Sequence, residues 1–151
     1  MPQPGESDLL NLLHDAARLV RTSADRRARA HGMTWAQCMT LFRLRRHDDL
    51  TQAALADLLE VEPITAGRLV DRLEARGLVE RRHDPADRCV WRLHLTPAAA
   101  PVLAAIDEAR RAFHAEATQG LAEAERRAAV AALAKMKSNL LAAGSLPGEA
   151  A

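Results

Sequence analysis

The chain has 151 residues, which is enough for one compact domain or for a small core with appended helices. Hydrophobic residues make up 48% and aromatic residues 3%, with alanine and leucine dominant, and this mixture favours helices. A formal net charge of +1 does not itself indicate a nucleic-acid binder, so a local basic patch would have to make such contacts. Because there is no apolar signal core and no run approaching about 18 apolar residues, we expect a soluble, cytoplasmic protein.

Two helices are predicted in the first third of the chain. Residues 1–6 are expected to form a flexible tail, and Ser7 can cap a helix that stops near Gly32. Thr34 opens the second helix, because Gln37 three residues later completes a capping box.

A closely spaced helix pair follows. Thr51 begins one helix, and Pro63 stands in the first turn of the next, where its missing N–H costs nothing. Gly77 ends this fourth helix. Its predicted inner positions are Ile64, Leu69, Val70 and Leu73.

The pattern then changes to that of a β-hairpin. Residues 78–82 and 90–95 are predicted strands around the turn-rich segment HDPADR, with Trp91, Leu93 and Leu95 on one side of the second strand. Two more helices are expected, one from Thr96-Pro97 to about Gly120 and one over about 122–143.

This element order predicts a mainly α (α+β) fold with a winged helix-turn-helix. The DNA-binding domain is expected over 34–96, the helical dimerisation region over 7–33 and 97–143, and flexible tails over 1–6 and 144–151. The first helix and the last two helices carry more apolar residues than a small winged domain can cover. This excess favours a two-fold homodimer, in which a second copy covers them. These residues are Val102, Leu103, Ile106, Phe113, Leu121, Val130, Leu133, Met136 and Leu140.

Basic side chains gather on the fourth helix and on the hairpin. The N-terminal part of such a helix can place side chains against base edges in a major groove, and an arginine at a hairpin tip can enter the adjacent minor groove. We expect an ion pair between Asp71 and Arg88 to fix the wing against the recognition helix. The expected DNA-contacting residues are Thr65, Ala66, Arg68, Arg72, Arg76, Arg82, Arg88 and Arg92.

The run LTQAALADLLEVEPITAGRLVDRLEARGLVERRHDPADRCVWRLHLTPAA resembles the core of the MarR family, and especially its SlyA-like branch. DRLEARGLVER and DPADR are its most specific segments. The resemblance implies a homodimer, usually a repressor, which binds a pseudo-palindromic operator and releases it when a small aromatic or anionic ligand binds. The family often has a second arginine after DPADR, and this chain has Cys89 there.

The resemblance also implies a pocket for a small aromatic carboxylate. Arg18 and Arg68 would clamp the carboxylate, and Thr34 would donate a hydrogen bond to it. Cys38 stands where relatives tend to have tryptophan, which would enlarge the pocket or alter its specificity. The expected ligand-binding residues are His14, Arg18, Thr34, Trp35, Cys38 and Arg68.

The sequence also bears on four other functions: redox sensing, metal binding, catalysis and protein interaction without DNA binding. A redox-responsive regulator would use Cys38 or Cys89, and Cys89 is the more reactive of the two by its arginine-rich surroundings. The six histidines have no tight ligand spacing, so no metal site and no cofactor are expected. The sequence has no phosphate loop, nucleophile elbow or HExxH motif, so no enzyme is expected. A helical interaction module without DNA binding is the alternative from another class.

Overall fold

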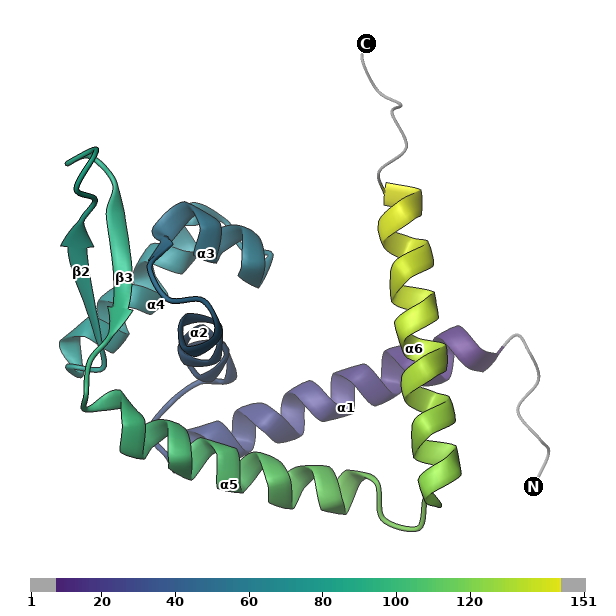
Figure 1. The fold of residues 1–151 in the computed structure, drawn as a ribbon. Coiled ribbons are helices and arrows are strands. Elements are labelled where there is room, and N and C mark those ends of the chain that lie inside the picture. The colour runs from purple at the N-terminus through teal and green to yellow at the C-terminus, as the bar shows by residue number, and fades with distance from the viewer. Residues whose placement is uncertain (1–7, 145–151) are drawn as a thin grey trace. The chain divides into compact units, whose positions relative to one another are not determined.

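A computed structural model describes residues 8–144 of the chain, which form six helices and three short strands (Figure 1). In order these are α1 (Leu9–Ala30), α2 (Trp35–Arg46), β1 (Leu50–Thr51), α3 (Gln52–Leu59), α4 (Pro63–Ala75), β2 (Val79–His83), β3 (Trp91–Leu95), α5 (Ala99–Ala117) and α6 (Glu123–Gly144). The described residues divide into two compact units, 8–111 and 112–144, with the boundary inside α5. The predicted tail 1–6, the predicted cap Ser7 and most of the predicted tail 144–151 lie outside the described residues, whereas Gly144 belongs to α6.

The helix starts follow from local capping chemistry. The Thr34 hydroxyl accepts a hydrogen bond from the Gln37 backbone N–H (3.2 Å), and the Gln37 side chain accepts one from the Thr34 N–H (2.8 Å). Thr51 caps α3 by accepting from the N–H of Ala54 (3.1 Å). Gly77 follows α4 with a φ of +69°, a conformation that glycine adopts without strain. The capping box and these helix limits are therefore confirmed.

The three strands form one antiparallel sheet in the order β1-β3-β2. The register pairs Val79 with Leu95 and His83 with Trp91, so the predicted hairpin is confirmed. Strand β1 was not predicted, because a two-residue strand is too short to show an alternating pattern. Trp91 shares a side of β3 with Leu93 and Leu95, as predicted, but it is 40% exposed and stacks on the His83 ring (centroids 3.9 Å apart), since it lies toward the hairpin tip.

Three of the four inner positions predicted for α4 are confirmed, and Ile64 is the exception. Ile64 is 66% exposed, whereas Ala66 is fully buried with Leu69, Val70 and Leu73. Consecutive helical residues are about 100° apart, so Ile64 lies about 200° from Ala66 around the axis and cannot share its face. The prediction that Ile64 points inward is wrong.

The outer helices contribute unequally to the core. Leu103 and Ile106 on α5 are buried in the core of their own chain, so these two residues do not need a partner. Residues 8–22, in contrast, are all exposed except for the half-buried Leu13, and α6 has no buried residue. None of the helices within 8–144 has the combination of length and apolar character that crossing a bilayer requires.

Candidate nucleic-acid interface

A tight turn joins α3 to α4. Glu60 ends α3 in the left-handed conformation (φ 54°), and the Val61 N–H donates to the Ala56 carbonyl, which closes the last turn of the helix. Pro63 then starts α4 in its first turn. The two helices therefore form a helix-turn-helix pair, with α4 as the second helix.

The outer face of α4 carries Thr65, Arg68 and Arg72, all exposed and spaced by three and four residues. Arg68 and Arg72 form no ion pair with any other residue in 8–144, so both guanidinium groups are available to a ligand. Ala66 was expected on this face, but it is fully buried. Its predicted contact with DNA is wrong, because the position belongs to the core-facing side of the helix.

Arg81 on β2 holds the hairpin against the helix pair. Its guanidinium lies 2.6 Å from the Asp71 carboxylate and 2.6 Å from that of Glu74, and it donates to the Gln52 side chain of α3 (3.2 Å). It also donates to the Gly67 carbonyl (3.4 Å), and its side chain is only 16% exposed. One cation thus joins β2 to both helices of the pair.

The predicted partner of Asp71 is therefore wrong: Asp71 binds Arg81 and not Arg88. Arg81 lies on β2, two residues after the buried Val79 and hence on the same side of the strand. Arg88 lies in the turn at the hairpin tip and is exposed. The alternation around Val79 was the signal that could have identified Arg81.

The tip of the wing is stabilised by Asp84 and Arg92. The Asp84 carboxylate accepts hydrogen bonds from the N–H groups of Ala86 (2.7 Å) and Asp87 (3.1 Å) and from the Arg92 guanidinium. The hydrogen bond from Arg92, followed by that from Ala86, lowers the pKa of Asp84. Arg92 also donates to the Asp49 carbonyl (2.8 Å), so its guanidinium links the wing tip to the segment before β1. This engagement within the chain argues against its predicted contact with DNA.

The three remaining arginines that were predicted to contact DNA lie in three different surroundings. Arg88 is exposed at the tip, and its carbonyl bonds to Nδ1 of His83 (2.8 Å), the ring stacked on Trp91. Arg82 is exposed and pairs with Glu80. Arg76 donates to the Gly32 carbonyl (2.9 Å) and so joins the end of α4 to the segment after α1.

The predicted ligand-binding residues have different surroundings in this chain. His14 and Arg18 lie in the exposed part of α1, where Arg18 is 3.6 Å from Asp15. The Thr34 hydroxyl is engaged in its capping box. Cys38 is 1% exposed in the core, and burial raises its thiol pKa to about 11.

These observations define a class of protein. A basic recognition helix anchored to a basic β-hairpin is the architecture of a winged-helix DNA-binding transcriptional regulator. A family model described as MarR family matches residues 31–88, which include the helix pair and the wing as far as its tip.

Solved structures of MarR family regulators are similar to this chain in sequence and in fold. A MarR family transcriptional regulator from Silicibacter pomeroyi is 31% identical; the match covers 85% of this chain and 86% of that one, with a TM-score of 0.71. The regulator SlyA is 26% identical over 88% of this chain and 94% of its own, with a TM-score of 0.77. BpsR from Bordetella bronchiseptica is 26% identical over 91% and 98%, with a TM-score of 0.76. The chain therefore belongs to the MarR family of transcriptional regulators, as its sequence predicts.

Proposed function

We propose that this protein is a homodimeric repressor that binds a pseudo-palindromic operator and releases it when a small aromatic or anionic ligand binds. The observation that carries the proposal is the outer face of α4, where Arg68 and Arg72 lie exposed and unpaired among the described residues. Arg81 anchors the wing beside this face, so helix and wing would meet DNA as one surface.

Each exposed group has a distinct expected role. Thr65 and Arg68, in the first half of α4, would contact base edges in the major groove. Arg72 lies one turn further along and would bind a phosphate. Arg88 would enter the minor groove, where the potential is strongly negative. Since Cys89 stands where the family often has a second arginine, the wing contact would depend on Arg88 alone.

The homodimer is supported by apolar residues that are exposed in a single chain. Leaving them in water is unfavourable by about 25 cal/mol per Å² of apolar surface, so a second copy would cover them. A two-fold dimer would place its recognition helices about 34 Å apart, which matches successive major-groove faces of a palindrome. The exposed residues are Leu9, Leu10, Leu12, Leu19, Val20, Leu121, Val130, Leu133, Leu140 and Leu141.

Selection of bound sequences from a random DNA pool tests DNA recognition. We expect a pseudo-palindromic site, which R68A should bind about 1–3 kcal/mol more weakly with relaxed specificity at one position of each half-site. R72A should weaken binding to all sequences and reduce the salt slope by about 1. R111A, which removes an exposed arginine from α5, is the matched control. Selection of no sequence, or equal effects of all three variants, would contradict the proposal.

Ligand response is supported by one relative, since DNA binding by BpsR is regulated by 6-hydroxynicotinic acid. A ligand that prefers a half-site spacing unsuited to DNA would weaken operator binding by its differential affinity, typically about 1–3 kcal/mol. The predicted clamp of Arg18 and Arg68 stays a prediction. Both residues are exposed in the single chain.

A further inference from the structure

Ile64, the second residue of α4, is a large apolar side chain that the fold leaves in water. It is 66% exposed, whereas Ala66 of the same turn is fully buried. Between residues 21 and 120, all of which the structure describes, the exposed large apolar residues are Ile64 and Trp91. The Trp91 ring stacks on His83, so part of its surface is covered within the chain. Core packing does not explain an isoleucine at position 64.

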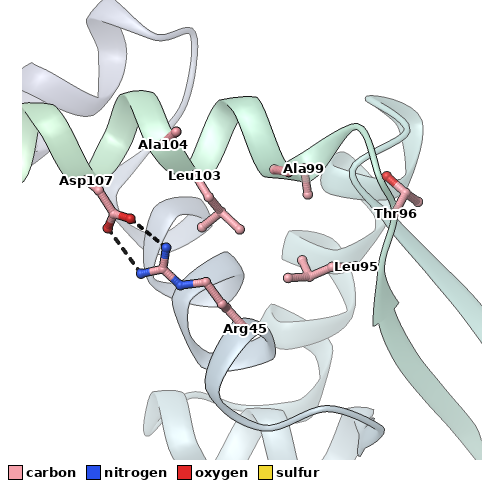
Figure 2. Close-up of a pocket in the computed structure, with 8 residues that line it drawn as sticks. Arg45, Leu95, Thr96, Ala99, Leu103, Ala104 and Asp107 are labelled. Atoms are coloured by element: carbon pink, nitrogen blue, oxygen red, sulfur yellow. Dashed lines mark hydrogen bonds and ion pairs between the residues drawn. The ribbon is translucent and has the colours of Figure 1, made fainter.

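Apolar side chains elsewhere in residues 8–111 meet one another. Leu95 of β3 and Leu103 of α5, for example, face a shared cavity of about 340 Å³ (Figure 2). On a helix, the residue three positions later is a neighbour that can cover a side chain, but for Ile64 this residue is Gly67. The isoleucine therefore remains available to a group outside the chain.

Ile64 shares the outer face of α4 with the residues proposed to contact DNA. Successive helical residues are about 100° apart, so Arg68 lies about 40° from Ile64 around the axis and about one turn further along. Thr65 follows directly, and all three side chains are exposed. Ile64 also belongs to the first turn of α4, and the N-terminal residues of a recognition helix are those that approach base edges. An aliphatic group would thus lie against the bases.

The chemistry of isoleucine restricts what it can recognise in a major groove. The base edges there present hydrogen-bond donors and acceptors, which an aliphatic side chain cannot pair with, and thymine alone of the four bases adds a methyl group. Contact removes apolar surface of both the methyl group and the isoleucine from water. Because isoleucine is β-branched, its χ1 angle has one strongly preferred rotamer in a helix, so little freedom is lost on contact.

Two simpler explanations compete with a role in recognition. A single exposed apolar residue is common on protein surfaces, and such a residue would be indifferent to DNA sequence. A second copy of the chain could also cover Ile64. However, Arg68 and Arg72 on the same face have no acidic partner in 8–144, so two such faces would repel one another, whereas phosphates attract them. DNA is therefore the favoured partner of this face.

We infer that Ile64 recognises the 5-methyl group of one thymine in each half-site of the operator. This thymine lies within about two base pairs of the base that Arg68 contacts, because four helical residues rise by about 6 Å and one base pair by about 3.4 Å. The inference deepens the proposed function and rests on it, since it requires α4 to lie in the major groove. It adds a second specificity-determining group, which reads shape and apolar surface where Arg68 reads hydrogen-bond acceptors.

Replacement of thymine by deoxyuridine tests the contact, because it removes only the methyl group and preserves base pairing. Each thymine position of the selected operator is replaced in both half-sites at once, and each DNA is titrated with the full-length protein. At one position the parent should bind about fourfold more weakly per half-site, or about 15-fold in all, as expected for one buried methyl group. I64A should bind the thymine and deoxyuridine operators equally.

Two comparisons guard against other causes. R72A should weaken binding to both DNAs and preserve their ratio, since a phosphate contact does not depend on the methyl group. At the sensitive position, operators with cytosine and with 5-methylcytosine are also compared. The parent should bind the methylated base about fourfold more tightly per half-site, and I64A should bind both equally. An effect of uracil on DNA stiffness would not produce this second result.

The possible outcomes separate the inference from the proposed function. Operator binding by the parent that is indifferent to deoxyuridine at every thymine overturns the inference alone. The inference is also overturned if I64A retains the sensitivity of the parent, or if the parent does not distinguish 5-methylcytosine from cytosine. Failure of the parent to bind any DNA sequence would overturn the proposed function and the inference together.

Discussion

The guanidinium of Arg81 on β2 lies 2.6 Å from the carboxylate of Asp71 on α4. Asp71 stands between Arg68 and Arg72 in the sequence, so the wing is anchored beside the residues proposed to contact DNA. Glu74 and Gln52 bind the same guanidinium, which leaves its side chain 16% exposed. Recognition helix and wing are therefore held in one fixed relationship.

Loss of this anchor should affect both folding and DNA binding. We expect R81A to lower the free energy of unfolding by about 1–3 kcal/mol, because Asp71, Glu74 and Gln52 lose a shared partner. DNA affinity should fall as well, since the wing would no longer be fixed to α4. Chemical denaturation and operator titration measure the two effects. R82A, on the exposed side of the same strand, should leave stability within about 0.5 kcal/mol of the parent.

Substitutions in the first half of α4 should separate packing from recognition. A66L inserts methylenes into a fully buried position and should destabilise the fold by about 1–3 kcal/mol. I64A removes an exposed side chain and should change stability by less than about 0.5 kcal/mol. Thermal unfolding of the two variants checks this. A stable A66L protein with impaired DNA binding would instead indicate that this position faces DNA.

The Arg45–Asp107 pair should contribute to acid sensitivity. The hydrogen bond from Arg45 lowers the pKa of Asp107 below its ordinary value of 3.8, so the ionised carboxylate favours the folded state. Its stabilisation is complete above that ordinary value and is lost as pH falls through the lowered one. The side chain of Asp107 is 29% exposed, so we expect only about 0.5–1 kcal/mol.

Denaturation curves between about pH 6 and pH 2 for the parent and D107N measure this contribution. The parent should lose more stability on acidification than D107N does. Some acid loss should persist in D107N, because the pKa values of Asp25 and Asp84 are lowered too. E108Q, a change at the exposed neighbouring residue, is the control and should follow the parent curve.

The stack of His83 and Trp91 should orient the wing tip. W91A removes the ring that lies 3.9 Å from His83, and His83 in turn bonds to the Arg88 carbonyl. We expect faster amide exchange at residues 86–89 and weaker operator binding, whereas W91F should retain both properties of the parent. Unchanged exchange in W91A would show that the turn around Asp84 suffices to hold the tip.

The two cysteines should differ in reactivity. Burial raises the pKa of Cys38 to about 11, so roughly one thiol in 10,000 is ionised at neutral pH. Cys89 is exposed on the wing. A thiol reagent should therefore modify the parent at one site, and C89S should react at least about tenfold more slowly. If peroxide weakens operator binding in the parent but not in C89S, the redox-responsive alternative is supported; equal behaviour rejects it for Cys89.

Several parts of the fold could be predicted from the sequence, because their signals are local. The capping box of Thr34 and Gln37, the Thr51 cap and the alternation of the hairpin each depend on residues close together in the chain. The motif segments around the recognition helix likewise sufficed to indicate the family. Strand β1 was missed because two residues carry no periodicity.

Other features were decided only by the tertiary structure. Arg81 rather than Arg88 binds Asp71, because strand pairing and packing determine which arginine lies beside α4. The exposure of Ile64 and the burial of Ala66 depend on the helical phase, and a shift of one residue rotates a side chain by about 100°. The pair of Arg45 on α2 and Asp107 on α5 likewise forms only when folding brings together two residues that are far apart in the chain. Local chemistry thus determines where elements begin and end, whereas the choice among several similar charged partners depends on distances that only folding establishes.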